Sequence, residues 1–180
     1  MGRRGGQGRH LRPQGESRGP DGRRDEGVRG RGDQEDAQLV PTVDPNNPKR
    51  FLYTTQTRGE FQFGFSRAVR HGPVVRVAGT AGIGPDGEVV SDDVIEQMRA
   101  AIVRMKGALE DLGCTLGDVI MTRVYVQNPA DLTNVAVVHG EVFRDIRPAM
   151  TIVKVDFIDP KILVEIECEA VYGGADEKKP

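Results

Sequence analysis

The chain has 180 residues, and its 25 lysine and arginine residues against 27 aspartate and glutamate residues give a formal net charge of −2. This charge excludes a protein that coats nucleic acid by charge alone, and no apolar run reaches the roughly 20 residues that a membrane-spanning helix needs. The two cysteines exclude a disulfide scaffold and a zinc ribbon. Because no apolar segment follows Arg3 and Arg4 as it would in a secretory signal, we expect a soluble, reduced, cytoplasmic protein.

Residues 1–38 differ in composition from the rest of the chain. They contain ten glycines, nine arginines and seven acidic residues, hence a net charge of only +2, and very few apolar side chains. Such a segment cannot bury enough surface to offset its ordering entropy, so we expect a disordered Gly/Arg-rich tail. Arg-Gly repeats are typical of RNA-binding tails, but the acidic residues and the absence of Phe and Tyr favour a solvated extension. Residues 174–180 are expected to form a charged C-terminal tail.

Residues 39–60 are expected to be a linker. Three prolines between positions 41 and 48 prevent a helix and favour extended or turn conformations. Within this segment, residues 51–53 are expected to form a short edge strand. The folded domain is then expected to occupy residues 61–173, which is close to the usual domain size.

Five strands are predicted within this domain. Residues 63–69 and 74–79 are rich in strand-forming side chains and are separated by a His71-Gly72 turn signal, which predicts two consecutive strands. The remaining strands are expected at residues 119–126, 151–155 and 163–172.

Two helices are predicted between the strands. Asp92 or Asp93 can cap the first by accepting a hydrogen bond from a free backbone N–H, and Gly113 is expected to end it in the left-handed conformation. Its apolar residues recur every three or four positions, the period of one buried helical face. They are Val94, Met98, Ile102, Met105, Leu109 and Leu112. Asp131 is expected to cap the second helix. The apolar face of that helix consists of Leu132, Val135, Val138 and Val142.

The resulting order β-β-α-β-α-β-β predicts a two-layer α+β domain in which two helices pack on one face of a mixed sheet. Strands such as 119–126 are apolar with few breaks, so the other face needs a cover as well. A symmetric homo-oligomer would supply this cover, and the clefts between its subunits would then be the natural ligand sites.

Several stretches of the domain, taken together, carry a resemblance to a known family. They are Phe65–Val69 (FSRAV), Val77–Thr80 (VAGT), Leu109–Asp118 (LEDLGCTLGD), Arg123–Val126 (RVYV), Arg147–Ala149 (RPA) and Val164–Glu167 (VEIE). In this pattern the sequence resembles the Rid family (RidA/YjgF), the reactive-intermediate imine and enamine deaminases, over residues 61–173. The resemblance implies a chorismate-mutase-like α+β fold, a homotrimer with three clefts at the subunit interfaces, and hydrolysis of 2-iminoacids to 2-ketoacids and ammonia. It implies no metal and no cofactor.

The resemblance also implies roles for individual residues. Glu165 matches the family's glutamate that helps activate water, and Phe65 stands where a pocket tyrosine is usual. Gly79 and Thr80 match a Ser-Gly segment of the second strand. Met150 replaces the arginine that grips the substrate carboxylate, and a thioether cannot make the charge-assisted, bidentate bond of an arginine.

Alternatives remain open for the other polar residues of these strands and helices. One face of the last strand carries three glutamates, Glu165, Glu167 and Glu169. Glu167 and Glu169 are expected to form a solvated acidic surface. Arg123, in an otherwise apolar strand, is either in a structural ion pair with a glutamate across an interface or a relocated anion clamp. His139 is either a half-buried, hydrogen-bonded residue or a proton carrier that lines the cleft.

The sequence thus predicts a trimer that binds a small metabolite in clefts between its subunits. If it is an enzyme, the predicted reaction is hydrolysis of an imine or enamine, or a related cyclisation or tautomerisation. Glu165 and Thr80 are the candidate catalytic residues. The candidate substrate-binding residues are Phe65, Gly79, Arg123, His139 and Met150. The alternatives are a non-catalytic metabolite sensor or partner-binding trimer and, more weakly, an RNA-binding or endoribonuclease-like protein. We expect no membrane contact and no nucleic-acid partner.

Overall fold

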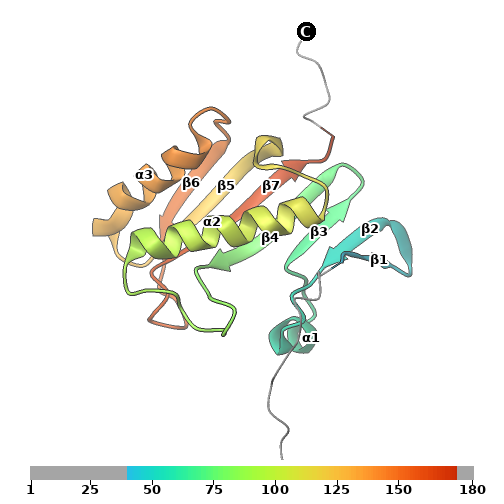
Figure 1. The fold of residues 1–180 in the computed structure, drawn as a ribbon, viewed down its shortest axis with the longest axis horizontal. Helices are drawn as coiled ribbons and strands as arrows, with labels where there is room; N and C mark the ends of the chain where they lie inside the picture. Colours follow the sequence, from blue (N-terminus) through green and yellow to red (C-terminus); the bar gives the residue numbers. More distant parts are fainter. Residues whose placement is uncertain (1–39, 174–180) are drawn as a thin grey trace, which may run out of the picture. The chain divides into compact units, whose positions relative to one another are not determined.

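The computed structural model describes residues 40–173. The predicted tails at 1–38 and 174–180 lie outside the described residues. Within residues 40–173, seven strands form one sheet in the order β1-β2-β3-β4-β7-β5-β6 (Figure 1). The strands are β1 Thr42–Asp44, β2 Asn47–Tyr53, β3 Ala68–His71, β4 Val74–Ala81, β5 Val119–Val126, β6 Ala149–Lys154 and β7 Val164–Val171. Strands β5 and β6 are parallel and the other neighbouring pairs are antiparallel, so the mixed sheet is as predicted.

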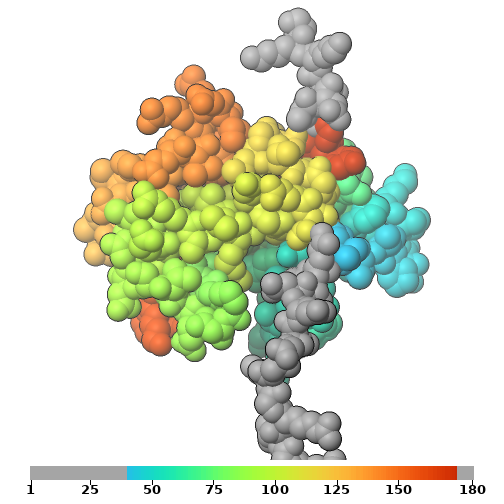
Figure 2. All heavy atoms as spheres, viewed as in Figure 1, coloured from blue at the N-terminus to red at the C-terminus, as the bar shows by residue number. Residues whose placement is uncertain are grey.

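Two long helices, α2 and α3, lie on the same face of this sheet (Figure 1). Figure 2 shows that face, with α2 in yellow-green and α3 in orange lying over the strands. The helices of the described residues are α1 Arg58–Phe63, α2 Val94–Asp111 and α3 Leu132–Phe143. The predicted two-layer α+β arrangement is confirmed, and neither α2 nor α3 covers the second face of the sheet.

The ends of α2 follow the sequence prediction. The Asp93 carboxylate accepts hydrogen bonds from the backbone N–H groups of Ile95 and Glu96, at 2.8 and 3.0 Å. After the helix, Gly113 has a φ of +83°, the left-handed conformation that glycine adopts without steric cost. These two residues fix the length of α2 and therefore the position of its apolar face over the sheet.

The core lies between the helices and the sheet. Its helical part is the apolar face of α2, with Met98, Ile102, Met105 and Leu109 all buried. The facing side chains of the sheet are also buried and include Val75, Val77, Val124 and Ile166. Alternate residues of β7 contribute Ile166, Cys168 and Ala170 to this core, which leaves its three glutamates on the opposite face.

Replacing Met98 with alanine is expected to lower the free energy of unfolding by about 2–5 kcal/mol, because a fully buried side chain would leave a cavity. Val103→Ala is the matched control, since Val103 belongs to the same helix but is 68% exposed. Denaturant unfolding of both variants measures the difference. Equal losses in the two would contradict the assignment of the buried helical face.

The first predicted strand of the domain, 63–69, was wrong over residues 63–67. Residues Arg58–Phe63 form α1, and β3 begins only at Ala68. Glu60 holds this helix in place, because its buried carboxylate accepts hydrogen bonds from the hydroxyl groups of Thr54 and Thr55. Gly64, with a φ of +70°, ends it.

The segment 39–60 contains more regular structure than the single strand expected at 51–53. Strand β2 runs from Asn47 to Tyr53 and pairs with both β1 and β3, so it extends the sheet instead of only attaching its end. A second correction concerns Asp131, whose side chain makes no capping hydrogen bond to α3. Instead, the side chain of Asn128 accepts from the N–H of Ala130 in the short turn before the helix.

Candidate functional site

Glu165 lies on β7, on the sheet face that α2 and α3 do not cover. It is opposite Ala81 of β4 and Tyr125 of β5 in the strand register. Its carboxyl group lies directly against Gly79, because a Cβ atom added to that glycine would be 2.1 Å from Glu165 Oε1. The glycine therefore provides the space in which the glutamate side chain lies.

The carboxyl group of Glu165 is partly desolvated. Burial raises its pKa above the ordinary glutamate value, the positive charge of Arg67 opposes the shift, and the negative charge of Glu167 adds to it. Among residues 40–173 the structure gives this carboxyl group no hydrogen-bond donor. An unpaired carboxyl group with a raised pKa is a candidate for both accepting and donating a proton.

Arg67 lies on the other side of Gly79. Its Nη1 donates a hydrogen bond to the carbonyl oxygen of Gly79, and its Nε lies 3.8 Å from Glu60 Oε1. Burial alone would raise the pKa of Glu60, but the hydrogen bonds from two threonines and the charge of Arg67 outweigh it and lower the pKa. The charged form of Glu60 is therefore favoured beside this arginine, whereas the pKa of Glu165 is shifted in the opposite direction.

Phe65 lies beside the arginine and is 44% exposed. The guanidinium of Arg67 is 6.0 Å from the centre of its ring. Phe65 also lines a cavity of about 370 Å³ together with Ser66, Glu60 and Phe61. We call Glu165, Gly79, Arg67 and Phe65 the Glu165 site.

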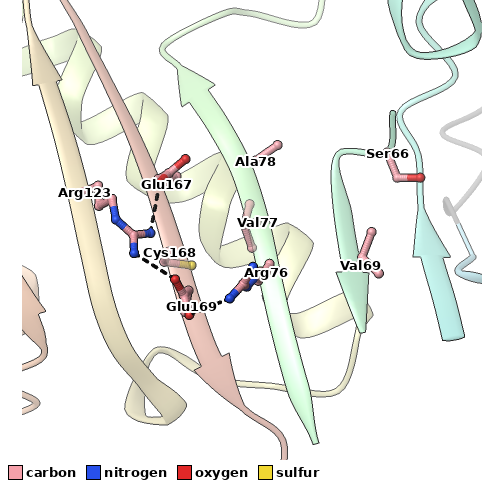
Figure 3. A pocket seen from close by; sticks show the side chains of 9 residues that line it. All are labelled: Ser66, Val69, Arg76, Val77, Ala78, Arg123, Glu167, Cys168 and Glu169. Atoms are coloured by element: carbon pink, nitrogen blue, oxygen red, sulfur yellow. Dashed lines mark hydrogen bonds and ion pairs between the residues drawn. The ribbon is translucent and has the colours of Figure 1, made fainter. Parts of the chain in front are cut away.

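Arg123 is held by two carboxylates of its own chain. Its Nη1 donates to Glu167 at 3.0 Å and its Nη2 donates to Glu169 at 2.9 Å (Figure 3). Glu169 also accepts a hydrogen bond from Arg76 at 3.3 Å. These four residues line a cavity of about 280 Å³ on the uncovered face, to which Ser66 and Ala78 also contribute. The ion pair expected for Arg123 is therefore present, but within one chain and not across an interface.

Two other predicted site residues face the core. Thr80 is buried, and its hydroxyl donates a hydrogen bond to the carbonyl oxygen of Ala78 at 2.8 Å. His139 of α3 is buried as well, hydrogen-bonds Thr122 at 3.0 Å and stacks on Phe143. The structure does not bring His139 to Glu165, because Thr122 and Glu165 lie on opposite faces of the sheet. Their catalytic and binding roles stay predictions.

The burial of His139 predicts a pH dependence of stability. Burial lowers its pKa, so the unfolded chain binds more protons than the folded one at mildly acidic pH. The stabilisation is fully present above about pH 6.5, the ordinary histidine value, and is lost as the pH falls through the lower pKa of the folded state. Between about pH 7.5 and about pH 5, wild type should lose more unfolding free energy than His139→Gln, by denaturant titration. Equal losses would contradict the burial.

Met150 and Glu165 lie on opposite faces of the sheet in one copy of the chain. In the parallel pairing of β5 and β6, Met150 is opposite Thr122, whose side chain faces α3. Met150 is nevertheless 44% exposed, since β6 is the edge strand. The two positions that the resemblance places in one cleft therefore do not meet within one subunit.

Of the seven predicted residues, Glu165 and Gly79 lie against each other, and Phe65 is linked to them through Arg67. The sequence analysis missed Arg67, which completes this group. The available signal was its position two residues after Phe65 in the FSRAV motif, but its contact with Gly79 becomes visible only in the fold.

Two further properties concern the described part of the chain as a whole. In residues 40–173, His, Cys, Asp and Glu side chains form no group of three or more that could hold a metal ion. None of the helices in this range combines the length and the apolar character needed to cross a membrane.

Comparison with known proteins gives consistent matches. The family described as Endoribonuclease L-PSP matches residues 57–172. An uncharacterized protein from Streptomyces coelicolor is 37% identical over 118 residues, which is 65% of this chain and 88% of that protein. The human 2-iminobutanoate/2-iminopropanoate deaminase is 27% identical over 110 residues, covering 61% of this chain and 80% of the human protein.

A solved structure shows the same fold. The crystal structure of a member of the YjgF/YER057c/UK114 family from Mycobacterium tuberculosis matches with a TM-score of 0.62 and 41% sequence identity. The match covers 68% of this chain and 98% of the mycobacterial one. The predicted chorismate-mutase-like α+β fold is thereby confirmed.

Proposed function

Because the chain belongs to the family described as Endoribonuclease L-PSP, which contains the YjgF and RidA proteins, we propose that it hydrolyses imines or enamines of small metabolites. The reaction takes place at Glu165 and yields a carbonyl compound and ammonia. The observation that carries the proposal is the desolvated carboxyl group against Gly79. A human relative that bears the name of an imine deaminase supports the same chemistry.

The carboxyl group of Glu165 suits both halves of this reaction. In the first half, its carboxylate form takes a proton from water while the water oxygen bonds to the imine carbon and the imine nitrogen is protonated. The proton taken from water passes to the imine nitrogen, which restores the carboxylate. In the second half, the carboxylate takes the hydroxyl proton of the resulting carbinolamine and delivers a proton to its nitrogen, so that the C–N bond breaks. Ammonia leaves and the C=O bond forms, with no net oxidation or reduction.

A complete site requires more than one copy of the chain in this proposal. Glu165 lies on the uncovered face of the sheet, whereas the exposed Met150 lies on the other face at the edge strand β6. In a homotrimer, the edge of one subunit would close the Glu165 site of its neighbour and place the Met150 side chain there as an apolar wall. Sedimentation at three times the 19.7 kDa chain mass is the expected result. A monomer at working concentration would contradict this arrangement.

The test of the function is imine hydrolysis by the wild-type protein. An amino-acid oxidase generates imines from a panel of amino acids, and their loss is followed with and without the protein. Wild type is expected to shorten the imine lifetime and to release ammonia at a matching rate. A rate equal to the no-protein control across the panel would overturn the proposal.

A ligand sensor without turnover is the second candidate, because two of the predicted polar site residues already form hydrogen bonds within the chain. The Thr80 hydroxyl is bonded to a backbone carbonyl and the Arg123 guanidinium to two carboxylates. A sensor would be stabilised against heat by a ligand that it does not convert. RNA cleavage is less well supported, since Arg76 and Arg123 would have to leave their glutamates to bind phosphates.

A further inference from the structure

The Glu165 site lacks an arginine at position 150, but it contains an arginine that the chain does not fully satisfy. Arginine carries five N–H donors. The Nη1 of Arg67 donates to the carbonyl oxygen of Gly79, while its Nε is buried without a hydrogen-bond partner. Its Nη2 makes no hydrogen bond to any residue in the range 40–173. The side chain remains 18% exposed, so part of the guanidinium is open to a ligand.

The charged groups around Arg67 are compatible with binding of an anion. Glu60 provides one buried carboxylate, but a second arginine, Arg104 of α2, lies close enough for the two positive charges to disfavour each other. Arg104 donates to the carbonyl oxygen of Ala81 at 2.7 Å and forms no ion pair with a described residue. Glu60 is the only carboxylate among residues 40–173 that lies within 4 Å of either arginine.

The position of Arg67 relative to Glu165 fits a small carboxylate ligand. Both side chains contact Gly79, the arginine through the backbone oxygen and the glutamate through the space of the missing Cβ. The charge of Arg67 also acts on the Glu165 carboxyl group, so a carboxylate bound to Nη2 would lie in the same site. In a 2-iminoacid the carboxylate is attached directly to the imine carbon, so a carboxylate bound to Arg67 would hold that carbon beside the same arginine.

We propose that Arg67 binds the carboxylate of the ligand and thereby selects 2-iminoacids and 2-oxoacids, although Met150 occupies the family's arginine position. The inference rests on the proposed function, because it names the substrate class of the same site. In a trimer the family's arginine would reach the site from a neighbouring subunit, whereas Arg67 belongs to the same chain as Glu165. In this proposal the positive charge that binds the carboxylate is supplied by position 67 instead of position 150.

The test uses the full-length protein and two stable probes of nearly the same size, 2-oxobutanoate and its neutral amide. Isothermal titration calorimetry is expected to show that wild type binds the carboxylate about 10- to 100-fold more tightly than the amide, as for a charge-assisted bond. Arg67→Gln should lose this preference. Arg99→Gln should keep it, since Arg99 is an exposed residue of α2 paired with Glu96 and Glu141.

Two further variants keep the test decisive if Arg67→Gln is poorly folded beside the buried Glu60. Arg67→Lys keeps the charge but loses the planar fork, so it should bind 2-oxobutanoate more weakly than wild type. Adding Met150→Arg to Arg67→Gln should restore the preference for the carboxylate. Thermal unfolding of each variant shows whether it is folded.

The outcomes separate this inference from the proposed function. If wild type hydrolyses imines but Arg67→Gln keeps the full preference for the carboxylate, Arg67 is not the clamp and the hydrolase proposal stands. If no imine is hydrolysed but the preference depends on Arg67, the clamp stands and the hydrolase proposal fails. Equal binding of both probes by wild type, or no binding of either, would overturn the role of Arg67.

Discussion

Replacing Glu165 with glutamine is expected to lower kcat/KM for imine hydrolysis by about 100-fold or more, the usual contribution of a positioned acid or base. Glutamine has nearly the same shape, so the contact with Gly79 and the fold should persist. The amide cannot take the proton from water at any accessible pH, and only the spontaneous reaction and substrate binding would remain. Steady-state rates with an oxidase-generated imine measure the change.

Glu169→Gln is the matched control for this substitution. Glu169 lies four residues along the same strand and faces the same side of the sheet, but its carboxylate is committed to Arg123 and Arg76. The control is expected to keep imine hydrolysis within about threefold of wild type, since it lies away from the proposed reacting atoms. Equal losses in the two variants would show that the acidic face as a whole, and not Glu165, supports activity.

Gly79→Ala is expected to separate activity from stability. The new Cβ would lie 2.1 Å from Glu165 Oε1, so the carboxyl group must move. Because the obstructing atom is the end of a flexible side chain, the free energy of unfolding should change by no more than about 1 kcal/mol. The displaced carboxyl group would no longer be positioned against the substrate, and a 1 Å displacement can cost about 100-fold in rate.

Gly82→Ala is the control, because it is expected to lower stability where Gly79→Ala is expected to lower activity. A Cβ on Gly82 would lie 2.6 Å from the backbone oxygen of Gln97 and 2.8 Å from its Cα, where α2 approaches the chain just after β4. Backbone cannot move as a side chain does, so we expect a loss of about 1–3 kcal/mol in unfolding free energy. Thermal or denaturant unfolding and activity, measured on both variants, check the pair. A stability loss in Gly79→Ala as large as in Gly82→Ala would contradict this assignment of the space beside Glu165.

The parts of the fold that the sequence predicts are those with local causes. The period of the apolar residues, the Asp93 cap and the left-handed Gly113 define α2 within a single stretch of chain. The alternation of β7 likewise separates its buried residues from Glu165 and its two neighbouring glutamates. Each of these features depends on residues within a single helix or strand or directly next to it. The spacing of apolar residues along the sequence is therefore sufficient to predict it.

The missed parts depend on contacts between distant residues. Phe61, Phe63 and Phe65 alternate as in a strand, yet the first two are at the surface of α1 and are 70% and 73% exposed. Hydrogen bonds between Glu60 and two threonines upstream help to hold that turn, and no periodicity reveals them. An alternating pattern therefore gave the wrong element where buried polar contacts determine the structure.

The candidate site shows the same division. Glu165, Gly79 and Phe65 are identified by matching motifs, because each lies within a short stretch that resembles a motif of the Rid family. The strand register on both sides of β5 places Arg123 beside its two glutamates. The same register puts Met150 and Glu165 on opposite faces of the sheet, and the sequence does not specify this register. Arg67 becomes a candidate only when β3 and β4 place it at the carbonyl group of Gly79.

The pH dependence of kcat/KM for imine hydrolysis, measured for wild type and Glu165→Gln after subtraction of the spontaneous rate, tests the central claim most directly. Because the carboxylate form takes the proton from water, wild-type kcat/KM should fall as the pH drops through the pKa of Glu165. Burial places that pKa above the ordinary glutamate value. The account predicts that this acid limb disappears in Glu165→Gln together with most of the rate. The same acid limb and a comparable rate in the variant would show that Glu165 is not the group that handles the proton.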